Sequence, residues 1–210
     1  MCNNFSMTRR YEQRRRAEQQ EATRRRIVEA AIELHGTTGP ARTTMSAVAE
    51  RAGVQRNTLY RHFSDERMLL YACSALHGEQ HPLPSPDDWR EIREPVARAR
   101  RGLGELYAYF EQNEAMIANV LRDAEVDPVT REVSTVRLGE PLAALRGALL
   151  DGWARSRGRR RARLEAMLDL AMSFHTWQSL VRDSGLASAG AAELMAAALG
   201  CAYGRPVDSA

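Results

Sequence analysis

Two kinds of side chain in this sequence are candidates for chemistry, a short histidine–glutamate cluster and a set of arginines. His77, Glu79 and His81 alternate along the chain, and imidazole and carboxylate groups are common metal ligands. The cluster runs into Pro82, however, and lacks the i, i+4 histidine pair of a helical zinc site. Gly-rich phosphate loops, nucleophile elbows and paired catalytic acids do not occur. We therefore expect no catalytic residue, no metal site, no cofactor and no enzyme.

The basic residues point instead to nucleic acid. All 30 are arginine, which forms bidentate contacts with phosphate and guanine. Residues 1–26 contain eight arginines and three glutamates, a net charge of +5, whereas residues 27–78 are neutral and residues 79–210 carry −2. The positive excess therefore lies in an N-terminal arm. Codon bias in a GC-rich genome also produces exclusive use of arginine. The absence of lysine is therefore explained either by codon bias or by contacts with nucleic acid.

Composition sets the broad class of the protein. The 210 residues are 44% hydrophobic and 27% charged, as expected for one large globular domain or two small ones. The longest nearly continuous apolar run, 194–203, is shorter than the roughly 18 residues of a membrane span. The N-terminus lacks an apolar signal core, and the three cysteines are scattered. We therefore expect a cytoplasmic protein without membrane partners.

Helices must position any functional side chain, because no stretch alternates with period two for long enough to form a sheet. Helical periodicity predicts long helices over 96–112, 114–124, 129–153, 160–182 and 189–203. The fold class we expect is all-α.

The densest local signals lie between residues 22 and 70. Ile27 and Leu34 belong to the apolar face of a first helix, and Thr43 or Thr44 is a good N-cap for a second. Gly53 supplies the left-handed position of a sharp turn. A short third helix follows, with Leu59 and Phe63 directed to the core. Three short helices with this turn predict a helix-turn-helix.

These residues resemble the N-terminal domain of the TetR family of bacterial transcriptional regulators. The resemblance rests on Ala52-Gly53-Val54, followed at the right distance by Thr58-Leu59-Tyr60-Arg61-His62-Phe63. It covers about a quarter of the chain. It implies a homodimer whose two recognition helices enter successive major grooves of a palindromic double-stranded DNA operator.

The resemblance also assigns residues to DNA. Gln55, Arg56 and Asn57 are expected to reach base edges, with Arg56 suited to guanine. Thr58, Tyr60 and His62 match positions that hold the phosphate backbone, joined by Thr44. The full set so assigned is Thr44, Gln55, Arg56, Asn57, Thr58, Tyr60, Arg61 and His62.

Other roles remain open for some of these residues. Tyr60 would also serve to cover the helix pair, and His62 to cap the turn. Glu66 stands where the family often has a phosphate-binding lysine, so that contact is in doubt. The arginines of the arm suit a narrow minor groove, but a solvated tail that adds only nonspecific attraction is the alternative.

The prolines after Gly78 and the charge distribution divide the chain into segments, and the resemblance gives the later helices two roles, ligand binding and dimerisation. We expect a flexible arm over 1–21, the helix-turn-helix domain over 22–80, a Pro-rich connection over 81–95, the ligand-binding and dimerisation domain over 96–203, and a tail over 204–210.

Candidates for each role of the second domain can be named. For an unknown small-molecule inducer, the expected pocket residues are Trp89, Tyr107, Phe110, Met116, Trp153, Met172 and His175. For a homodimer through the last two helices, the expected seam is Leu164, Met167, Leu168 and Ala171 with Ala192, Met195, Ala198 or Leu199, and Ala202. Ordinary core packing explains both sets equally well.

The function expected from the sequence is a sequence-specific DNA-binding transcriptional regulator, a repressor released from its operator by a small molecule. The alternative is a helical binding module that uses its basic arm on membrane or protein, without sequence-specific recognition of DNA.

Overall fold

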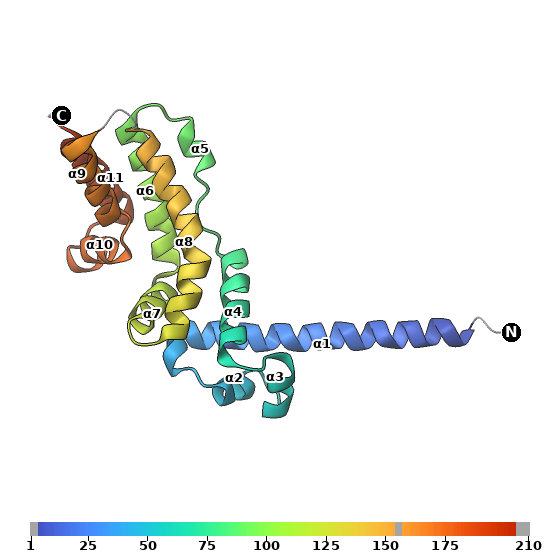
Figure 1. Ribbon diagram of the computed structural model, residues 1–210. Helices are drawn as coiled ribbons and strands as arrows, with labels where there is room; N and C mark the ends of the chain where they lie inside the picture. Colours follow the sequence, from blue (N-terminus) through green and yellow to red (C-terminus); the bar gives the residue numbers. More distant parts are fainter. Residues whose placement is uncertain (1–3, 154–156, 205–210) are drawn as a thin grey trace. The chain divides into compact units, whose positions relative to one another are not determined.

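The computed structural model of the protein describes residues 4–153 and 157–204, in which every regular element is helical (Figure 1). The all-α prediction is therefore confirmed. The chain divides into two compact units, one formed by Met1–Gln80 with Ala118–Ser134 and the other by His81–Ile117 with Thr135–Ala210. Among the described residues, no helix is both long and apolar enough to cross a bilayer.

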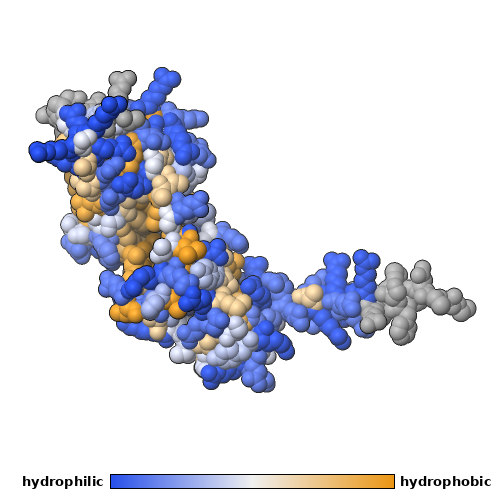
Figure 2. Space-filling view, in the orientation of Figure 1, coloured by the Kyte–Doolittle hydropathy of each residue, from blue (hydrophilic) through white to orange (hydrophobic). Residues whose placement is uncertain are grey.

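The first helix is much longer than the sequence suggested. α1 (Asn4–Thr37) continues well beyond the other helices of its unit (Figure 1). Where a flexible arm was expected over 1–21, the described residues of that segment are helical. Its Arg, Glu, Gln and Ala residues are good helix formers, and an Arg14–Glu18 pair at 2.9 Å spans one turn. Figure 2 shows that the described part of this extension is largely polar on the face in view.

The helix-turn-helix has the ends that its local sequence predicts. α2 (Met45–Arg51) is capped by Thr44, whose Oγ1 accepts the Ala47 N–H at 3.2 Å. Gly53 has φ +64° in the turn to α3 (Arg56–His62). α4 (Glu66–Gln80) begins after Asp65, whose Oδ1 accepts the Met68 N–H at 2.8 Å. The expected helix-turn-helix is confirmed.

One continuous core holds these helices together. Leu59 and Phe63 of the α3 segment are almost completely buried and pack with residues of α1, α2 and α4. The other buried members of this core are Ile27, Val28, Ala30, Ala31, Met45, Val48, Ala49, Leu69 and Cys73. The inner face of α3 is thereby fixed, and its opposite face is left to solvent.

The end of α7 (Glu114–Ala124) also belongs to the first unit, through a set of contacts that we call the α7 clasp: Asn119, Arg122 and Asp123. Asn119 Nδ2 donates to the carbonyls of His35 and Gly36 at 3.1 and 2.8 Å, near the C-terminus of α1. Such carbonyls have no partner within a helix. The clasp therefore supplies hydrogen bonds that α1 cannot make by itself.

Asp123 is the buried centre of the clasp. Its side chain is 3% exposed and accepts the Ala41 N–H at 2.9 Å and the Arg122 Nε–H at 2.8 Å. Ala41 lies in the short 3₁₀ helix η1 (Pro40–Arg42) that leads to α2. Gly39 has φ +103°, and a Cβ at that position would overlap the Asp123 carboxylate. Residues 118–134 are thus part of the helix-turn-helix unit, which the expected domain boundaries did not include.

The second unit is built around a long helix, α6 (Pro95–Gln112). α6 packs on α11 (Ser188–Tyr203), which in turn packs on α9 (Gly158–Ala171). The remaining helices are α5 (Asp87–Arg90), α8 (Pro128–Asp151, whose first residues belong to the first unit), α10 (Phe174–Gln178) and the π-helical segment η2 (Ser179–Asp183). The segment expected as a Pro-rich connection therefore contains a helical turn, and its Trp89 is fully buried.

Two expectations about this unit need correction. The helix predicted over 160–182 is broken at Ser173, which is extended (φ −72°, ψ 132°) and begins α10. The expected dimer seam faces the interior of its own chain, because α9 and α11 pack on each other and α11 packs on α6. Its buried members are Leu164, Leu168, Ala171, Ala192, Met195 and Leu199.

The clasp generates a prediction about stability. Asp123→Ala leaves the Ala41 N–H without its acceptor and removes one of the acceptors of Arg122, and leaving a buried hydrogen-bonding group unsatisfied costs about 1–3 kcal/mol. We expect the free energy of unfolding, measured by urea titration at fixed protein concentration, to fall by that amount. Glu125→Ala, an exposed carboxylate two residues away, is the control and should be nearly neutral. Equal losses in both variants would show that the clasp is unimportant.

Candidate nucleic-acid interface

The two faces of α3 differ sharply. Leu59 is completely buried, whereas Gln55, Arg56, Asn57, Tyr60 and Arg61 are exposed. Gln55 is the N-cap residue and makes no side-chain capping bond, so its amide is not engaged by the helix. The structure therefore brings together on one surface the side chains that the sequence assigned to base edges.

Arg56 and Tyr60 form a pair on this surface. They lie one turn apart, the guanidinium carbon is 5.5 Å from the centre of the ring, and Arg56 Nη2 donates to the hydroxyl oxygen at 3.4 Å. Tyr60, 39% exposed, does not cover the helix pair as the alternative proposed. Its ring instead supports a guanidinium held at the start of the helix.

The charge of this surface is not neutralised. Within the described residues, no carboxylate pairs with Arg56 or Arg61, whereas Arg51 is paired with Glu33 and Arg67 with Glu132. Arginines without an acid partner are those that can neutralise phosphate. The unpaired positive charge of this helix-turn-helix is thus next to its polar recognition surface.

Thr44 and Thr58 lie at helix starts. The exposed Thr44 accepts a backbone hydrogen bond, so its hydroxyl proton remains available to a phosphate oxygen. Thr58 is half-buried on α3.

His62 fits its expected role less well. It is half-buried, its Nε2 atom is shielded from solvent, and that atom has no hydrogen-bond partner among the described residues. Partial burial, together with the charges of Arg61 and Arg24, lowers the pKa of His62, with Glu21 acting in the opposite direction. The charged form of His62 is thus disfavoured, and its shielded Nε2 is not available to a phosphate.

Arg24 is a residue that sequence reasoning missed. Its guanidinium carbon lies 4.9 Å from the centre of the Phe63 ring, beside His62. The sequence places it in a run of three arginines at the edge of the arm. Its spacing of four residues from the buried Val28 was the available signal, because that spacing selects one face of a helix.

The helical form of the arm changes what it can do. An α-helix is about 10–12 Å wide with its side chains, whereas the minor groove is about 6 Å wide. The described part of the extension cannot enter that groove as a helix. Its arginines are instead suited to the phosphates that line a groove.

The expected inducer-pocket residues do not form one group. Tyr107 and Phe110 stack at 6.1 Å, and Phe110 meets Phe174 and Trp177 at 5.6 and 6.1 Å. His175 is exposed beside Phe174.

The two tryptophans of that set have other partners than this aromatic cluster. Trp89 donates its indole N–H to Glu105 at 2.8 Å, and Trp153 packs on Tyr203 at 4.9 Å. Met116 and Met172 are half-buried. The structure thus places Tyr107 and Phe110 in a cluster with two further aromatic rings, and it places both tryptophans of the set elsewhere.

The histidine–glutamate cluster has no surrounding ligand set. His77 and Glu79 lie in the last turns of α4, and His81 follows that helix. In the part of the chain that the structure describes, no group of three His, Cys, Asp or Glu side chains is arranged to hold a metal ion.

Comparison with known proteins agrees with this geometry. Residues 27–73 match the family model described as "Bacterial regulatory proteins, tetR family". The HTH-type transcriptional regulator SrpR of Pseudomonas putida is 39% identical over 70 residues, which are 33% of this chain and 32% of that protein. TtgR, also an HTH-type transcriptional regulator of Pseudomonas putida, is 33% identical over 95 residues, 45% of each chain. The chain thus spans about a third to a half of the length of these relatives.

Solved structures extend the likeness over most of the chain. A tetR-family transcriptional regulator from Streptomyces coelicolor has a TM-score of 0.57 at 16% identity, covering 87% of this chain and 80% of that one. The transcriptional regulator FadR from Bacillus subtilis, solved in complex with stearoyl-CoA, has a TM-score of 0.60 at 17% identity, covering 83% and 96%. At these identities the likeness concerns the fold.

The Arg56–Tyr60 pair generates a prediction. Tyr60→Ala removes the ring that supports Arg56, so we expect affinity for the preferred DNA duplex to fall tenfold or more, since single recognition contacts are worth about 1–3 kcal/mol. Gel-shift titration at physiological salt measures this. Tyr11→Ala is the matched control, because Tyr11 is exposed and also has an arginine, Arg15, over its ring at 6.0 Å. Unchanged affinity in Tyr60→Ala would contradict the assignment of α3.

Proposed function

The chain belongs to the tetR family of bacterial regulatory proteins through residues 27–73, and on this premise we propose that it is a sequence-specific DNA-binding transcriptional regulator. In this proposal the protein is a repressor that a small molecule releases from a palindromic operator. The observation that carries the proposal is the exposed polar side of α3, which presents Arg56, Asn57, Tyr60 and Arg61 beside the exposed N-cap residue Gln55, while Leu59 is buried in the core. A helix with one face anchored in a core and the other polar is suited to the major groove, which is about 12 Å wide.

The side chains of α3 offer a chemically specific reading of bases. Arg56 can donate to the O6 and N7 atoms of guanine, and Gln55 or Asn57 can pair with adenine. Thr44, Arg61 and Arg24 then serve the phosphates on either side. Phosphate contacts position the protein, whereas contacts with base edges specify the sequence.

A ligand can release the protein from its operator because ligand binding and DNA binding are thermodynamically linked. An inducer must bind better to the form whose recognition helices do not fit the operator, with a coupling of about 1–3 kcal/mol that acts equally in both directions. FadR, which shares the fold, was solved with stearoyl-CoA. The cluster of Tyr107, Phe110, Phe174 and Trp177 supports an apolar ligand in the second unit of this chain.

Dimerisation uses the outer faces of α9 and α11 rather than the seam expected from the sequence. Leu170 is 52% exposed on α9, and Leu194 is 49% exposed on α11. Ala166 is exposed one turn before Leu170, and Gly190 one turn before Leu194. Small and apolar exposed residues on two helices that pack together are suited to a four-helix interface with a second copy.

Selection of bound sequences from random DNA by the full-length protein tests the proposed function. We expect a two-fold symmetric sequence, since a homodimer presents two identical recognition helices. We also expect binding about 10³-fold or more tighter than to random duplex at physiological salt. Failure to enrich any sequence would overturn the proposal and favour a binding module that uses charge alone.

The dimer surface has its own test. Leu194→Glu places a charge in the proposed interface, so we expect a shift from dimer to monomer in analytical ultracentrifugation. Val126→Glu is the control, because Val126 is 77% exposed and lies in the first unit. A Leu194→Glu variant that remains as dimeric as this control would contradict the assignment of the interface.

A further inference from the structure

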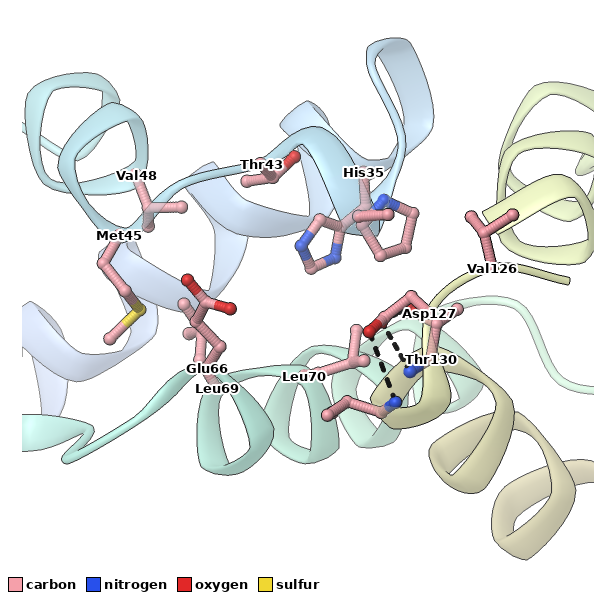
Figure 3. Close-up of a pocket in the computed structure, with 13 residues that line it drawn as sticks. His35, Thr43, Met45, Val48, Glu66, Leu69, Leu70, Val126, Asp127 and Thr130 are labelled. Atoms are coloured by element: carbon pink, nitrogen blue, oxygen red, sulfur yellow. Dashed lines mark hydrogen bonds between the residues drawn. The ribbon is translucent and has the colours of Figure 1, made fainter. Parts of the chain in front are cut away.

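The first unit contains a cavity of about 290 Å³ that the proposed function does not use (Figure 3). Its walls come from the end of α1, η1, the start of α2, the start of α4, the residues between α7 and α8, and the start of α8. All of these segments belong to the helix-turn-helix unit. The volume is at the lower end of the range typical of small-molecule sites.

His35 projects into this cavity from α1 (Figure 3). It is only 6% exposed, and it is one of the residues that line the cavity. Burial lowers the pKa of His35 to about 4, although the Asp123 carboxylate acts in the opposite direction. The ring is therefore neutral at physiological pH and has a lone pair that can accept a hydrogen bond. An acceptor in the wall of a cavity can take a hydrogen bond from a ligand that carries a donor.

The charged side chains that line the cavity are both acidic, and Arg131 acts on one of them, Asp127, from outside the lining. Glu66 and Asp127 line it, and no arginine does, in a chain with 30 arginines. The Asp127 carboxylate already accepts the Thr130 N–H at 2.8 Å and the Thr130 hydroxyl at 2.5 Å. The Glu66 carboxylate, at the start of α4, forms neither an ion pair nor a side-chain hydrogen bond with any described residue. The available charge is thus a single carboxylate.

The rest of the lining is largely apolar. Met45, Val48 and Leu69 are buried side chains of the unit's core that also face the cavity, and Leu70 and Val129 are half-buried. A ligand that fits both the polar and the apolar part of the lining needs a positively charged group that donates hydrogen bonds, and an apolar body.

We propose that this cavity binds a small amphiphilic organic cation. Its ammonium group pairs with Glu66 and donates a hydrogen bond to His35, and its apolar body packs on Met45, Leu69 and Val129. The site is separate from the aromatic cluster of the second unit. Because Met45 is the first residue of α2, occupancy also alters operator affinity, a consequence that rests on the proposed function.

The probe for a direct test is 4-phenylbutylammonium, with the neutral 4-phenylbutan-1-ol as its matched analogue. Full-length protein labelled with ¹³C at the methionine methyl groups is titrated with each compound in the absence of DNA. We expect the ammonium to shift the Met45 methyl resonance saturably and to bind about three- to tenfold more tightly than the alcohol, since Glu66 is exposed and its ion pair is partly screened. Equal binding of the two compounds, or shifts confined to Met116, Met167, Met172 or Met195, would overturn the proposal.

Two variants test which residues of the cavity bind the ammonium compound. Glu66→Gln should abolish the preference for the ammonium, whereas Glu50→Gln, an exposed carboxylate on α2 outside the cavity, should retain it. Val129→Phe fills the cavity from α8 and should remove binding of both compounds. An unchanged preference in Glu66→Gln, or unchanged binding in Val129→Phe, would contradict the site. Because the titration contains no DNA, its failure and the failure of operator selection are distinguishable.

Discussion

The helix-turn-helix depends on one buried carboxylate. Asp123 accepts the backbone N–H of Ala41, which lies 82 residues earlier in the chain, and thereby fixes the short turn that leads to α2. A buried charge is stable only when its hydrogen-bonding capacity is satisfied, so the backbone at Gly39 and Ala41 must follow the carboxylate closely. Since α2 leads through a tight turn to α3, the position of the recognition surface depends on a residue of α7.

The distribution of arginines follows a second constraint. An arginine with an acid partner stabilises the protein locally but offers little to DNA, as with Arg51 and Arg67. Arg56 and Arg61 have no acid partner within the described residues, and the ring of Tyr60 orients the first of them. The interface is therefore defined by the arginines that have no acid partner. The net charge of residues 27–78 is zero, so it does not reveal these unpaired arginines.

The parts that the sequence predicted well are those set by local chemistry. Thr44 and Gly53 act within a few residues of themselves, so the start of α2 and the turn to α3 could be predicted directly. The α7 clasp could not, because no local signal links Asp123 to Ala41. Periodicity showed which residues of α9 share a face but not which face points inward, and for this reason Leu164 was assigned to the dimer seam although it is core.

The central claim is that residues 118–124 are part of the DNA-binding unit and hold α2 and α3 in place. Native-state hydrogen exchange across a denaturant series tests it most directly, since amides that open together share one opening free energy. We expect the amides of 118–124 to exchange with the same opening free energy as those of α1 and α2 over 27–51. Exchange of 118–124 together with the amides of α6, at an opening free energy different from that of 27–51, would contradict it.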